Sequence, residues 1–433
     1  MTGPDRPDDG YLRALVAATE RAVAAAEPLG SPFAGAPADL REPVREAVVG
    51  LGDELVALSR DLHAHPETSF EEHWSAAAVA EVLRRHGHDP EVGTGLDTAL
   101  RCTTGGDGPH IGVLAEYDAL PGIGHGCGHN VIAASAVGAF LGLAGRAPGR
   151  VTLFGTPAEE GGGGKETMAR AGLFDDVDAV VMLHPFSHDV AMHPFLGRRQ
   201  VEMVFHGVAA HASAQPFMGR NALDAAVSAY TGVAALRQHL PPSDRLHGTF
   251  TDGGARPNVV PDRAALLFYV RSMEPDTLRD LAHRVSEIAH GAARMHGCTV
   301  DLTWDGKPAY LPIRQNTALA GRWAANQVER GRAPLAPGIV PEFLTGSTDL
   351  GNLSYRMPAI HPMLAIAGPT EALHTVGFAE AAGGEGGDRG VRDGADGLAL
   401  TALDYLADAD LRAAVHAEFA AQGGPIDVPS FFA

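Results

Sequence analysis

Short apolar segments alternate with helical segments between residues 110 and 183, and this alternation constrains the fold more than any other feature of the chain. We expect strands at residues 110–117, 150–156 and 177–183. The intervening segments 131–144 and 165–171 are expected to be helices. Strands that alternate with helices are typical of an open, mostly parallel α/β sheet.

Polar motifs follow each of these three strands. Cys127 and His129 lie in a Gly-His-Gly-Cys-Gly-His-Asn segment after the first strand, Glu159 and Glu160 follow the second, and His184 follows the third. In an open α/β sheet, ligands bind outside the carboxyl ends of the strands. We therefore expect these side chains to line one site.

The residue types of these motifs indicate a metal site. Thiolate, imidazole and carboxylate are the usual ligands of zinc and neighbouring divalent metals. A single glycine between Cys127 and His129 would let both side chains point at one ion. One of Glu159 and Glu160 would bind metal, and the other would take a proton from water. Bound metal lowers the pKa of water from about 15.7 toward ~7, so a carboxylate suffices as the base.

Two further residues are candidates on weaker grounds. His374 lies in a segment that follows the apolar run 364–367, and we expect it to be a ligand. Asp118 could hydrogen-bond to a ligand imidazole from behind, although a turn aspartate is the alternative interpretation.

Each motif taken alone also has a structural interpretation. Cysteine is among the residue types most often buried, so Cys127 could be an inert core thiol. An isolated Glu-Glu pair is often a solvated loop, and the chain contains 21 histidines. We interpret His188 and His193, which lie near His184, as structural residues.

The rhythm of the sequence changes near Gly197 and predicts a second domain. The pattern there is strand, helix, strand, strand, helix, strand, which is the ferredoxin-like βαββαβ unit. The expected elements are strands at 200–206, 246–251, 264–272 and 299–304 and helices at 221–239 and 276–296.

This second domain would be inserted into the first. We expect further helices at 11–26, 41–64 and 71–86, and we interpret the Gly-, Asp- and Glu-rich stretch 381–397 as a mobile loop. The predicted organisation is an N-terminal extension at 1–40, a catalytic domain at 41–196 and 306–422, an inserted domain at 197–305, and a C-terminal tail at 423–433.

Composition excludes several classes of function. The 433 residues are too many for one ordinary domain. The net charge of −20 argues against nucleic acid or an anionic membrane as a partner. Three cysteines do not build a disulfide framework. No apolar run approaches the ~20 residues of a membrane span, and the N-terminus lacks signal-peptide character. We therefore expect a cytoplasmic protein.

The motifs together resemble the dimetal aminoacylase/carboxypeptidase hydrolases. The similar branch holds hippurate hydrolase, plant auxin-conjugate amidohydrolases and aminobenzoyl-glutamate hydrolase. Segments 116–125 and 346–351 look most like the subgroup of aminobenzoyl-glutamate hydrolase and β-alanyl-lysine dipeptidase. The segments that carry the wider resemblance are 63–72, 127–129, 157–162 and 252–262.

The resemblance implies two divalent metal ions. Cys127 would bridge them, and Glu159 would be the general base. The remaining ligands would be His129, Glu160, His184 and His374. The wider clan has a ligand histidine at the position of Glu116 and a bridging aspartate in place of the cysteine, so this chain follows its branch instead.

The resemblance also implies a homodimer that forms through the inserted domain. His211 would reach the active site of the partner subunit and stabilise the tetrahedral oxyanion. Asn258 and Arg271 would contact a substrate carboxylate.

We therefore predict a metal-dependent amidohydrolase that cleaves an N-acyl amino acid or a small dipeptide, of the β-alanyl-dipeptide or aminobenzoyl-glutamate type. Zinc or manganese is the expected metal, with nickel and cobalt as alternatives. Two other hypotheses stay open. Cys127 could be a nucleophile activated by His129, or the chain could be a non-catalytic relative that binds a peptide or metabolite.

Overall fold

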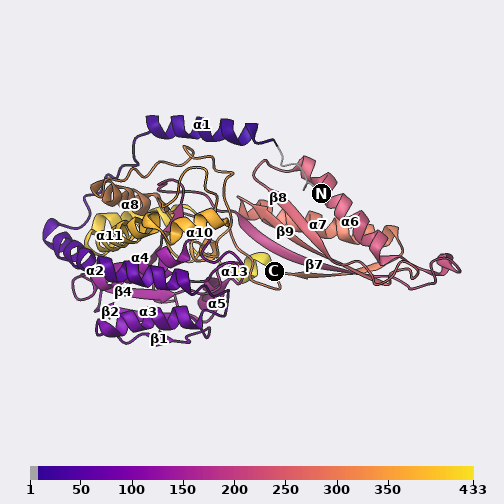
Figure 1. Cartoon of the computed structure of the whole chain (residues 1–433), viewed down its shortest axis with the longest axis horizontal. Coiled ribbons are helices and arrows are strands. Elements are labelled where there is room, and N and C mark those ends of the chain that lie inside the picture. The colour runs from indigo at the N-terminus through magenta and orange to yellow at the C-terminus, as the bar shows by residue number, and fades with distance from the viewer. Residues whose placement is uncertain (1–7) are drawn as a thin grey trace. The chain divides into compact units, whose positions relative to one another are not determined.

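The computed structural model describes residues 8–433, and the chain divides into two compact units (Figure 1). None of the helices in this described part combines the length and apolar character that a bilayer crossing requires. The first unit runs to His193 and also contains Arg314–Leu344 and Leu353–Ile426, and the second contains Pro194–Ile313, Thr345–Asn352 and Asp427–Ala433. The domain limits expected from the sequence stay a prediction.

A six-stranded sheet with the order β1-β2-β4-β3-β5-β11 forms the centre of the first unit. Strands β4, β3, β5 and β11 are parallel, whereas β2 pairs antiparallel with both of its neighbours. All six residues of β3 are buried, as expected for a central strand of a parallel sheet. The strands are β1 (Glu91–Val92), β2 (Leu100–Gly105), β3 (His110–Ala115), β4 (Arg150–Gly155), β5 (Ala179–Val181) and β11 (Ala359–Ile360).

The expectation of a mainly parallel sheet is confirmed, but the third expected strand is shorter than predicted. It ends at Val181. The chain then forms a separate strand, β6 (His184–Phe186), which pairs in parallel with β12 (Met363–Ala365). His184 is therefore the first residue of a strand rather than a residue after one.

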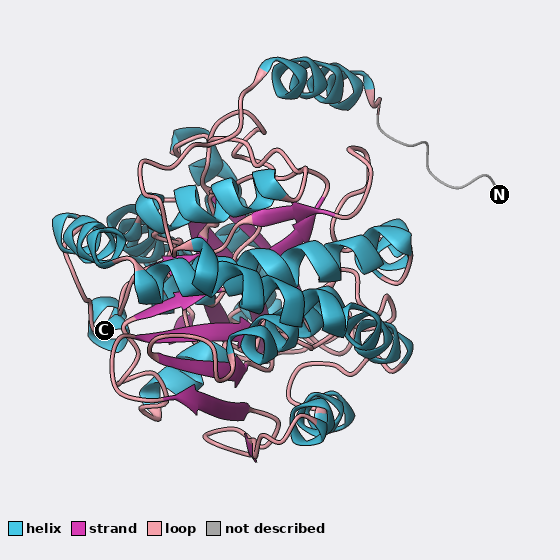
Figure 2. Cartoon of the chain, turned by 90° about the vertical axis from the view of Figure 1, so that its left-hand side faces the viewer, coloured by secondary structure: helices cyan, strands magenta, loops and turns pink. Residues whose placement is uncertain are grey.

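Helices cover the sheet of the first unit, as Figure 2 shows. Helix α4 is buried at every residue and packs against both α2 and α11. The helices approach closely because α4 carries small residues. A methyl group at Gly138 would collide with Leu55 of α2 and lie 2.8 Å from the Ala395 Cβ of α11. The helices are α1 (Gly10–Ala25), α2 (Ala38–Ala64), α3 (His73–Arg85), α4 (His129–Leu143), α5 (Gly164–Arg170), α8 (Thr317–Glu329), α10 (Val376–Ala382), α11 (Glu385–Ala407) and α12 (Ala409–Ala421).

The prediction of a mobile loop at 381–397 is wrong, because most of this stretch belongs to the long, largely buried helix α11. Its glycines face neighbouring elements that leave no room for a side chain. A Cβ at Gly394 would lie 2.5 Å from Leu183 and 2.7 Å from Ser135, and a Cβ at Gly397 would lie 2.8 Å from Trp323. Tight packing therefore overrides the low helix propensity of glycine.

The second unit contains the predicted βαββαβ order. Its four strands form an antiparallel sheet with the order β10-β7-β9-β8. Burial alternates along β7 and β9, and the buried side chains form one core with those of α6 and α7. The elements are β7 (Gly197–His206), α6 (Ala222–Leu236), β8 (Arg245–Asp252), β9 (Arg263–Ser272), α7 (Pro275–Met295), β10 (Thr299–Trp304) and α13 (Val428–Phe432), with the short helix α9 at Leu350–Leu353 and 3₁₀ turns at Pro216–Met218 and Arg237–His239.

Candidate metal centre

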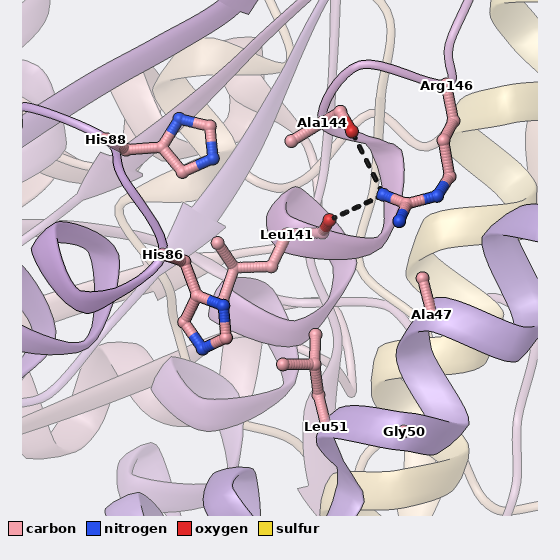
Figure 3. Close-up of a pocket in the computed structure, with 8 residues that line it drawn as sticks. All are labelled: Ala47, Gly50, Leu51, His86, His88, Leu141, Ala144 and Arg146. Carbon is pink, nitrogen blue, oxygen red and sulfur yellow. Dashed lines mark hydrogen bonds between the residues drawn. The ribbon is translucent and has the colours of Figure 1, made fainter.

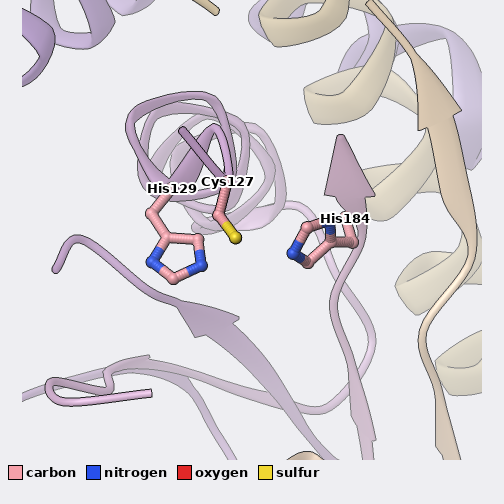
Figure 4. Close-up of side chains that lie close together, drawn as sticks. All are labelled: Cys127, His129 and His184. Atoms are coloured by element: carbon pink, nitrogen blue, oxygen red, sulfur yellow. The ribbon is translucent and has the colours of Figure 1, made fainter. Parts of the chain in front are cut away.

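A tight turn at the start of α4 aims Cys127 and His129 in the same direction (Figure 4). Gly128 between them has a φ of +77°. Any other residue would be strained in this left-handed conformation, and a Cβ there would lie 2.8 Å from the ring of Pro185. Both requirements explain the glycine that separates the two candidate ligands.

His184 approaches the same space from β6, as Figure 4 shows. Ligand atoms of Cys127, His129 and His184 lie within 4.8 Å of one another. His184 Nδ1 donates a hydrogen bond to the carbonyl of Pro185 over 2.7 Å, so Nε2 carries the lone pair. Burial and the neighbouring His129 lower the pKa of His184 to about 4. A neutral imidazole is the form that binds metal.

The Glu159–Glu160 pair follows a strained residue, Ala158, three positions after the end of β4. Ala158 has a φ of +59°, and its N–H donates to the buried carboxylate of Glu72 over 2.9 Å. This kink turns both following carboxylates to the same side, because oxygens of Glu159 and Glu160 lie within 4.8 Å of a ring nitrogen of His129. In a regular strand they would face opposite sides.

His374 closes the cluster from the segment before α10. Its φ of +63° is unusual for a residue other than glycine, and its N–H donates to the carbonyl of Gly126 over 3.0 Å. Its Nε2 lies 2.9 Å from Cys127 Sγ and 3.7 Å from Glu160 Oε1. More than half of this side chain is exposed, so it lies at the solvent edge of the cluster.

Asp118 holds His129 in place. His129 Nδ1 donates to the Asp118 carbonyl over 2.8 Å and approaches its Oδ1 at 3.0 Å. The other oxygen, Oδ2, accepts hydrogen bonds from Ser69 Oγ and from the N–H of Glu160. Asp118 thus fixes the His129 tautomer with Nε2 directed into the cluster, an arrangement common behind metal-binding histidines.

Burial and the carboxylates around the cluster shift the pKa values of Cys127 and His129. Burial, followed by the charges of Glu160 and Glu159, raises the pKa of Cys127 well above its usual value. Burial alone would lower the pKa of His129, but the hydrogen bond to Asp118 and the charges of Glu116, Asp118 and Glu160 raise it well above its usual value. The surrounding carboxylates thus favour positive charge at this point.

The hydrogen bonding of two buried atoms shows whether a metal ion fits the cluster. His129 Nε2 and Glu160 Oε1 are buried and receive no hydrogen bond from any described residue. Buried polar atoms without partners are rare and costly, and both are donors that a divalent cation accepts. The donor set of one thiol, three imidazoles and a carboxylate therefore fits a metal centre.

Three residues around the cluster were not expected there from the sequence. Glu116 Oε2 lies 3.4 Å from His129 Nε2, and Lys165 pairs with the other oxygen of Glu116. The buried His361 packs edge to face against His184, with ring centroids 5.4 Å apart. Glu116 follows β3 and His361 follows β11, so the strand-end rule that found the other residues also applies to these two.

Three expected site residues lie in the second unit. His211 Nδ1 accepts hydrogen bonds from the N–H groups of Ser213 and Ala214 at 3.3 and 3.2 Å, which places its proton on Nε2. The carbonyl of Asn258 accepts from the N–H of the residue after His211 over 3.0 Å. Arg271 lies on β9 and donates to Ser347 over 3.3 Å.

A surface pocket is distinct from the cluster (Figure 3). None of its lining residues belongs to the candidate centre, and its arginine is already engaged, because Arg146 Nη1 donates to the carbonyl of Ala144 over 3.0 Å near the end of α4. The lining residues are Ala47, Gly50, Leu51, His86, His88, Leu141, Ala144 and Arg146.

Comparison with known proteins decides the family. The model of Peptidase family M20/M25/M40 matches residues 112–377, a range that spans every residue of the candidate metal cluster. The chain belongs to this family. It is therefore a hydrolase of a family of metallopeptidases, and the expected resemblance is confirmed.

Relatives of this M20-family hydrolase include dipeptidases and amidohydrolases. The chain is 36% identical over 402 residues to Xaa-Arg dipeptidase of Mus musculus, which covers 88% of this chain and 92% of that protein. It is 38% identical over 277 residues to one subunit of the p-aminobenzoyl-glutamate hydrolase of Escherichia coli (strain K12), which covers 58% and 57% of the two chains. The fold resembles that of a Bacillus subtilis protein described as a dinuclear metal binding peptidase from the M20 family, with a TM-score of 0.63, 21% identity, and coverage of 82% and 99%.

Proposed function

We propose that this chain is a dipeptidase whose two divalent metals are held by Cys127, His129, Glu160, His184 and His374. One observation carries the proposal: these residues, drawn from four separate segments, form overlapping groups of ligand atoms within 4.8 Å of one another, and Glu159 forms such a group with His129 and Glu160. We propose zinc or manganese as the metal and the cytoplasm as the location. The sparse, unpaired cysteines support that location.

When bound, the metals would supply Lewis-acid activation of water and of the scissile carbonyl. The chain's own residues would move the protons. Glu159, 8% exposed, would accept a proton from the attacking water and deliver it to the departing amine. Asp118 would keep His129 in the ligand tautomer. These roles require no residue to act as a nucleophile.

The thiol mechanism in which His129 activates Cys127 is less well supported than metal ligation. The raised pKa of the buried thiol disfavours the thiolate on which nucleophilic catalysis depends. The imidazole nitrogen 2.9 Å from the sulfur belongs to His374, not to His129. The cysteine is better suited to metal ligation, because a metal ion would itself stabilise the thiolate.

We propose that the substrate is a small dipeptide with a free C-terminal carboxylate. The relatives' names, Xaa-Arg dipeptidase and p-aminobenzoyl-glutamate hydrolase, share one chemistry: an amide whose amine product is an amino acid. Asn258 and Arg271 would supply the amide and guanidinium groups that bind such a carboxylate. We prefer dipeptides because the dipeptidase is similar over nearly the whole chain.

A substrate panel tests this function. Metal-loaded protein is incubated with Xaa-Arg, Xaa-Lys and β-alanyl dipeptides, aminobenzoyl-glutamate, hippurate and N-acetyl amino acids, and the released amine is measured. Glu159→Gln should retain metal and lose at least about 10²-fold in turnover, whereas the exposed Glu81→Gln is a control that should match wild type. Wild-type turnover in Glu159→Gln would refute the base assignment, and no turnover of any dipeptide would refute the substrate class.

We also propose a homodimer in which His211 serves the active site of the other subunit. The exposed ring has its proton on Nε2, as a donor to an oxyanion requires. Complementation tests this role. Co-expressed His211→Ala and Glu159→Gln chains should recover about a quarter of wild-type activity, because half of the dimers are mixed and each mixed dimer has one intact site. A mixture as inactive as its parents would overturn the shared site.

A further inference from the structure

A buried lysine lies next to the candidate metal centre and has no role in the function proposed above. Lys165 is the second residue of α5, and its side chain is completely buried. A buried lysine is rare, because removing its charge from water is costly unless a negative group compensates. Lys165 Nζ donates to Glu116 Oε1, which is equally buried.

Glu116 connects the lysine to the centre. Its second oxygen, Oε2, lies 3.4 Å from His129 Nε2 and receives no hydrogen bond from the described residues. One end of the carboxylate is thus neutralised, and the other faces the imidazole nitrogen that would hold metal. The ion pair is therefore part of the immediate electrostatic environment of the cluster.

The charges around the cluster explain why a lysine belongs there. Glu116, Asp118, Glu159 and Glu160 give the surroundings of the cluster a negative charge, and Cys127 adds to it when it ligates as a thiolate. The ammonium of the lysine offsets part of this charge in a buried environment where excess charge is costly.

Neighbouring contacts fix α5, and therefore the lysine. The adjacent residue, Glu166, is also completely buried and accepts from Arg170 over 2.8 Å and from Arg356 over 3.1 Å. These ion pairs anchor the helix. The Lys165 charge thus has a permanent position before any metal arrives.

We propose that Lys165 is the fixed cation of the metal centre: it holds Glu116 in position and sets how strongly the centre attracts divalent ions. The proposal rests on the metal centre of the proposed function. Lys165 touches neither water nor substrate in this role and is a positioning residue. The ion pair then has a consequence that a purely structural pair would lack, because removing its two partners must have opposite effects on metal affinity.

Metal titration of purified apo-protein tests this. The Kd for Zn²⁺ and for Co²⁺ is measured by competition with a chromophoric chelator in wild type, Glu116→Gln, Lys165→Met and the double variant. Glu116→Gln removes one negative charge beside the ammonium, which then repels the incoming ions more strongly, and should raise the Kd at least about tenfold. Lys165→Met removes that repulsion, so its Kd should fall at least about threefold. The double variant should return to within about threefold of wild type.

The direction of the changes decides the outcome. A Kd that rises alike in both single variants would show a merely structural pair and overturn the proposal, as would wild-type affinity in either single variant. Should Glu116→Gln fail to fold by circular dichroism, Lys165→Met still decides, since an unchanged or higher Kd in that variant is contrary to the proposal. Exposed Lys307→Met is the matched control for loss of a lysine charge. A wild-type protein that bound no divalent ion would instead refute the proposed function.

Discussion

At the scale of single residues, the candidate centre depends on side chains that orient other side chains. Asp118 is fully buried and joins three groups: the imidazole of His129, the hydroxyl of Ser69 and the N–H of Glu160. It therefore positions two candidate ligands at once. Its own pKa stays below the usual value despite burial, because these hydrogen bonds and the charge of His129 favour the carboxylate.

Asp118→Asn should weaken metal binding by about 10- to 100-fold, because the imidazole loses its charged partner while the fold keeps an isosteric residue. Metal titration and a thermal melt measure the two effects. Ser69→Ala removes one of the hydrogen bonds to Asp118 and is the milder control, expected to change affinity less than about threefold. Equal affinity in Asp118→Asn and wild type would contradict the orienting role.

His110 should make the free energy of unfolding depend on pH. Burial lowers the pKa of His110 in the folded state. Nδ1 donates to the carbonyl of Asp176 and Nε2 accepts from the hydroxyl of Thr152, both over 2.7 Å, so the neutral ring is fully satisfied. In the unfolded chain the histidine has its ordinary pKa of about 6.5 and takes up a proton below that pH. Stability is therefore lost as the pH falls below about 6.5.

Urea unfolding of wild type and His110→Gln at pH 7.5 and 5.5 checks this. At pH 7.5 the free energy of unfolding should be larger for wild type than for His110→Gln. The difference should be smaller at pH 5.5, because the histidine of the unfolded wild type takes up a proton there and glutamine does not. Other buried histidines contribute equally to both proteins, so the difference isolates His110. Parallel pH profiles of the two proteins would rule out its contribution.

At the scale of elements, α11 shows how packing decides a structure that composition obscures. Gly387, Gly390, Gly394 and Gly397 recur at helical spacing and lie buried against their surroundings. In most helices such residues would be destabilising by about 1 kcal/mol each relative to alanine. Here each permits an approach that a methyl group would block.

Gly394→Ala should therefore destabilise the protein by about 1–3 kcal/mol, since the new Cβ would lie 2.5 Å from Leu183 and 2.7 Å from Ser135. Gly50→Ala in α2 is the matched control, because nothing lies within 4 Å of a Cβ there, and it should stabilise by about 0.5–1 kcal/mol. Chemical denaturation compares the two. A stabilising Gly394→Ala would show that helix propensity outweighs packing in α11.

The same contrast explains what could be predicted from the sequence. Apolar strands and amphipathic helices such as α7 can be predicted from the periodicity of their apolar residues. Polar residues at strand ends indicated where the candidate centre lies. Helix α11 could not be predicted in this way, because its glycine content is typical of a loop. Only the fold shows that these glycines pack against neighbouring elements. Lys165 was missed for a similar reason. A lysine near a glycine-rich turn is ordinarily solvated, and only the fold shows that it is buried against Glu116.

At the scale of the whole molecule, the candidate ligands tie distant parts of the chain together. Cys127 and His374 are 247 residues apart, yet their ligand atoms lie 2.9 Å apart. A metal that binds such a cluster stabilises only the folded state, by about 4 kcal/mol at a thousandfold excess over its Kd. Folding and metal binding are therefore linked.

Chelation should accordingly lower the melting temperature and abolish hydrolysis, and Zn²⁺ or Mn²⁺ should restore both. Differential scanning calorimetry of EDTA-treated and reloaded protein measures the shift, and the amine assay measures the activity. Glu160→Gln, with a weakened ligand set, should show a smaller shift on chelation. If EDTA left the melting temperature of the wild type unchanged, this result would argue against a bound metal.

The long separation between Cys127 and His374 also bears on biosynthesis. The chain is made from its N-terminus, and β11 at Ala359–Ile360 completes the sheet edge beside β5 only after the intervening unit has emerged. A nascent polypeptide that ends before His374 lacks this proposed ligand. Metal loading at the proposed centre would thus be a late step of synthesis, and a product truncated before His374 would lack part of the proposed ligand set.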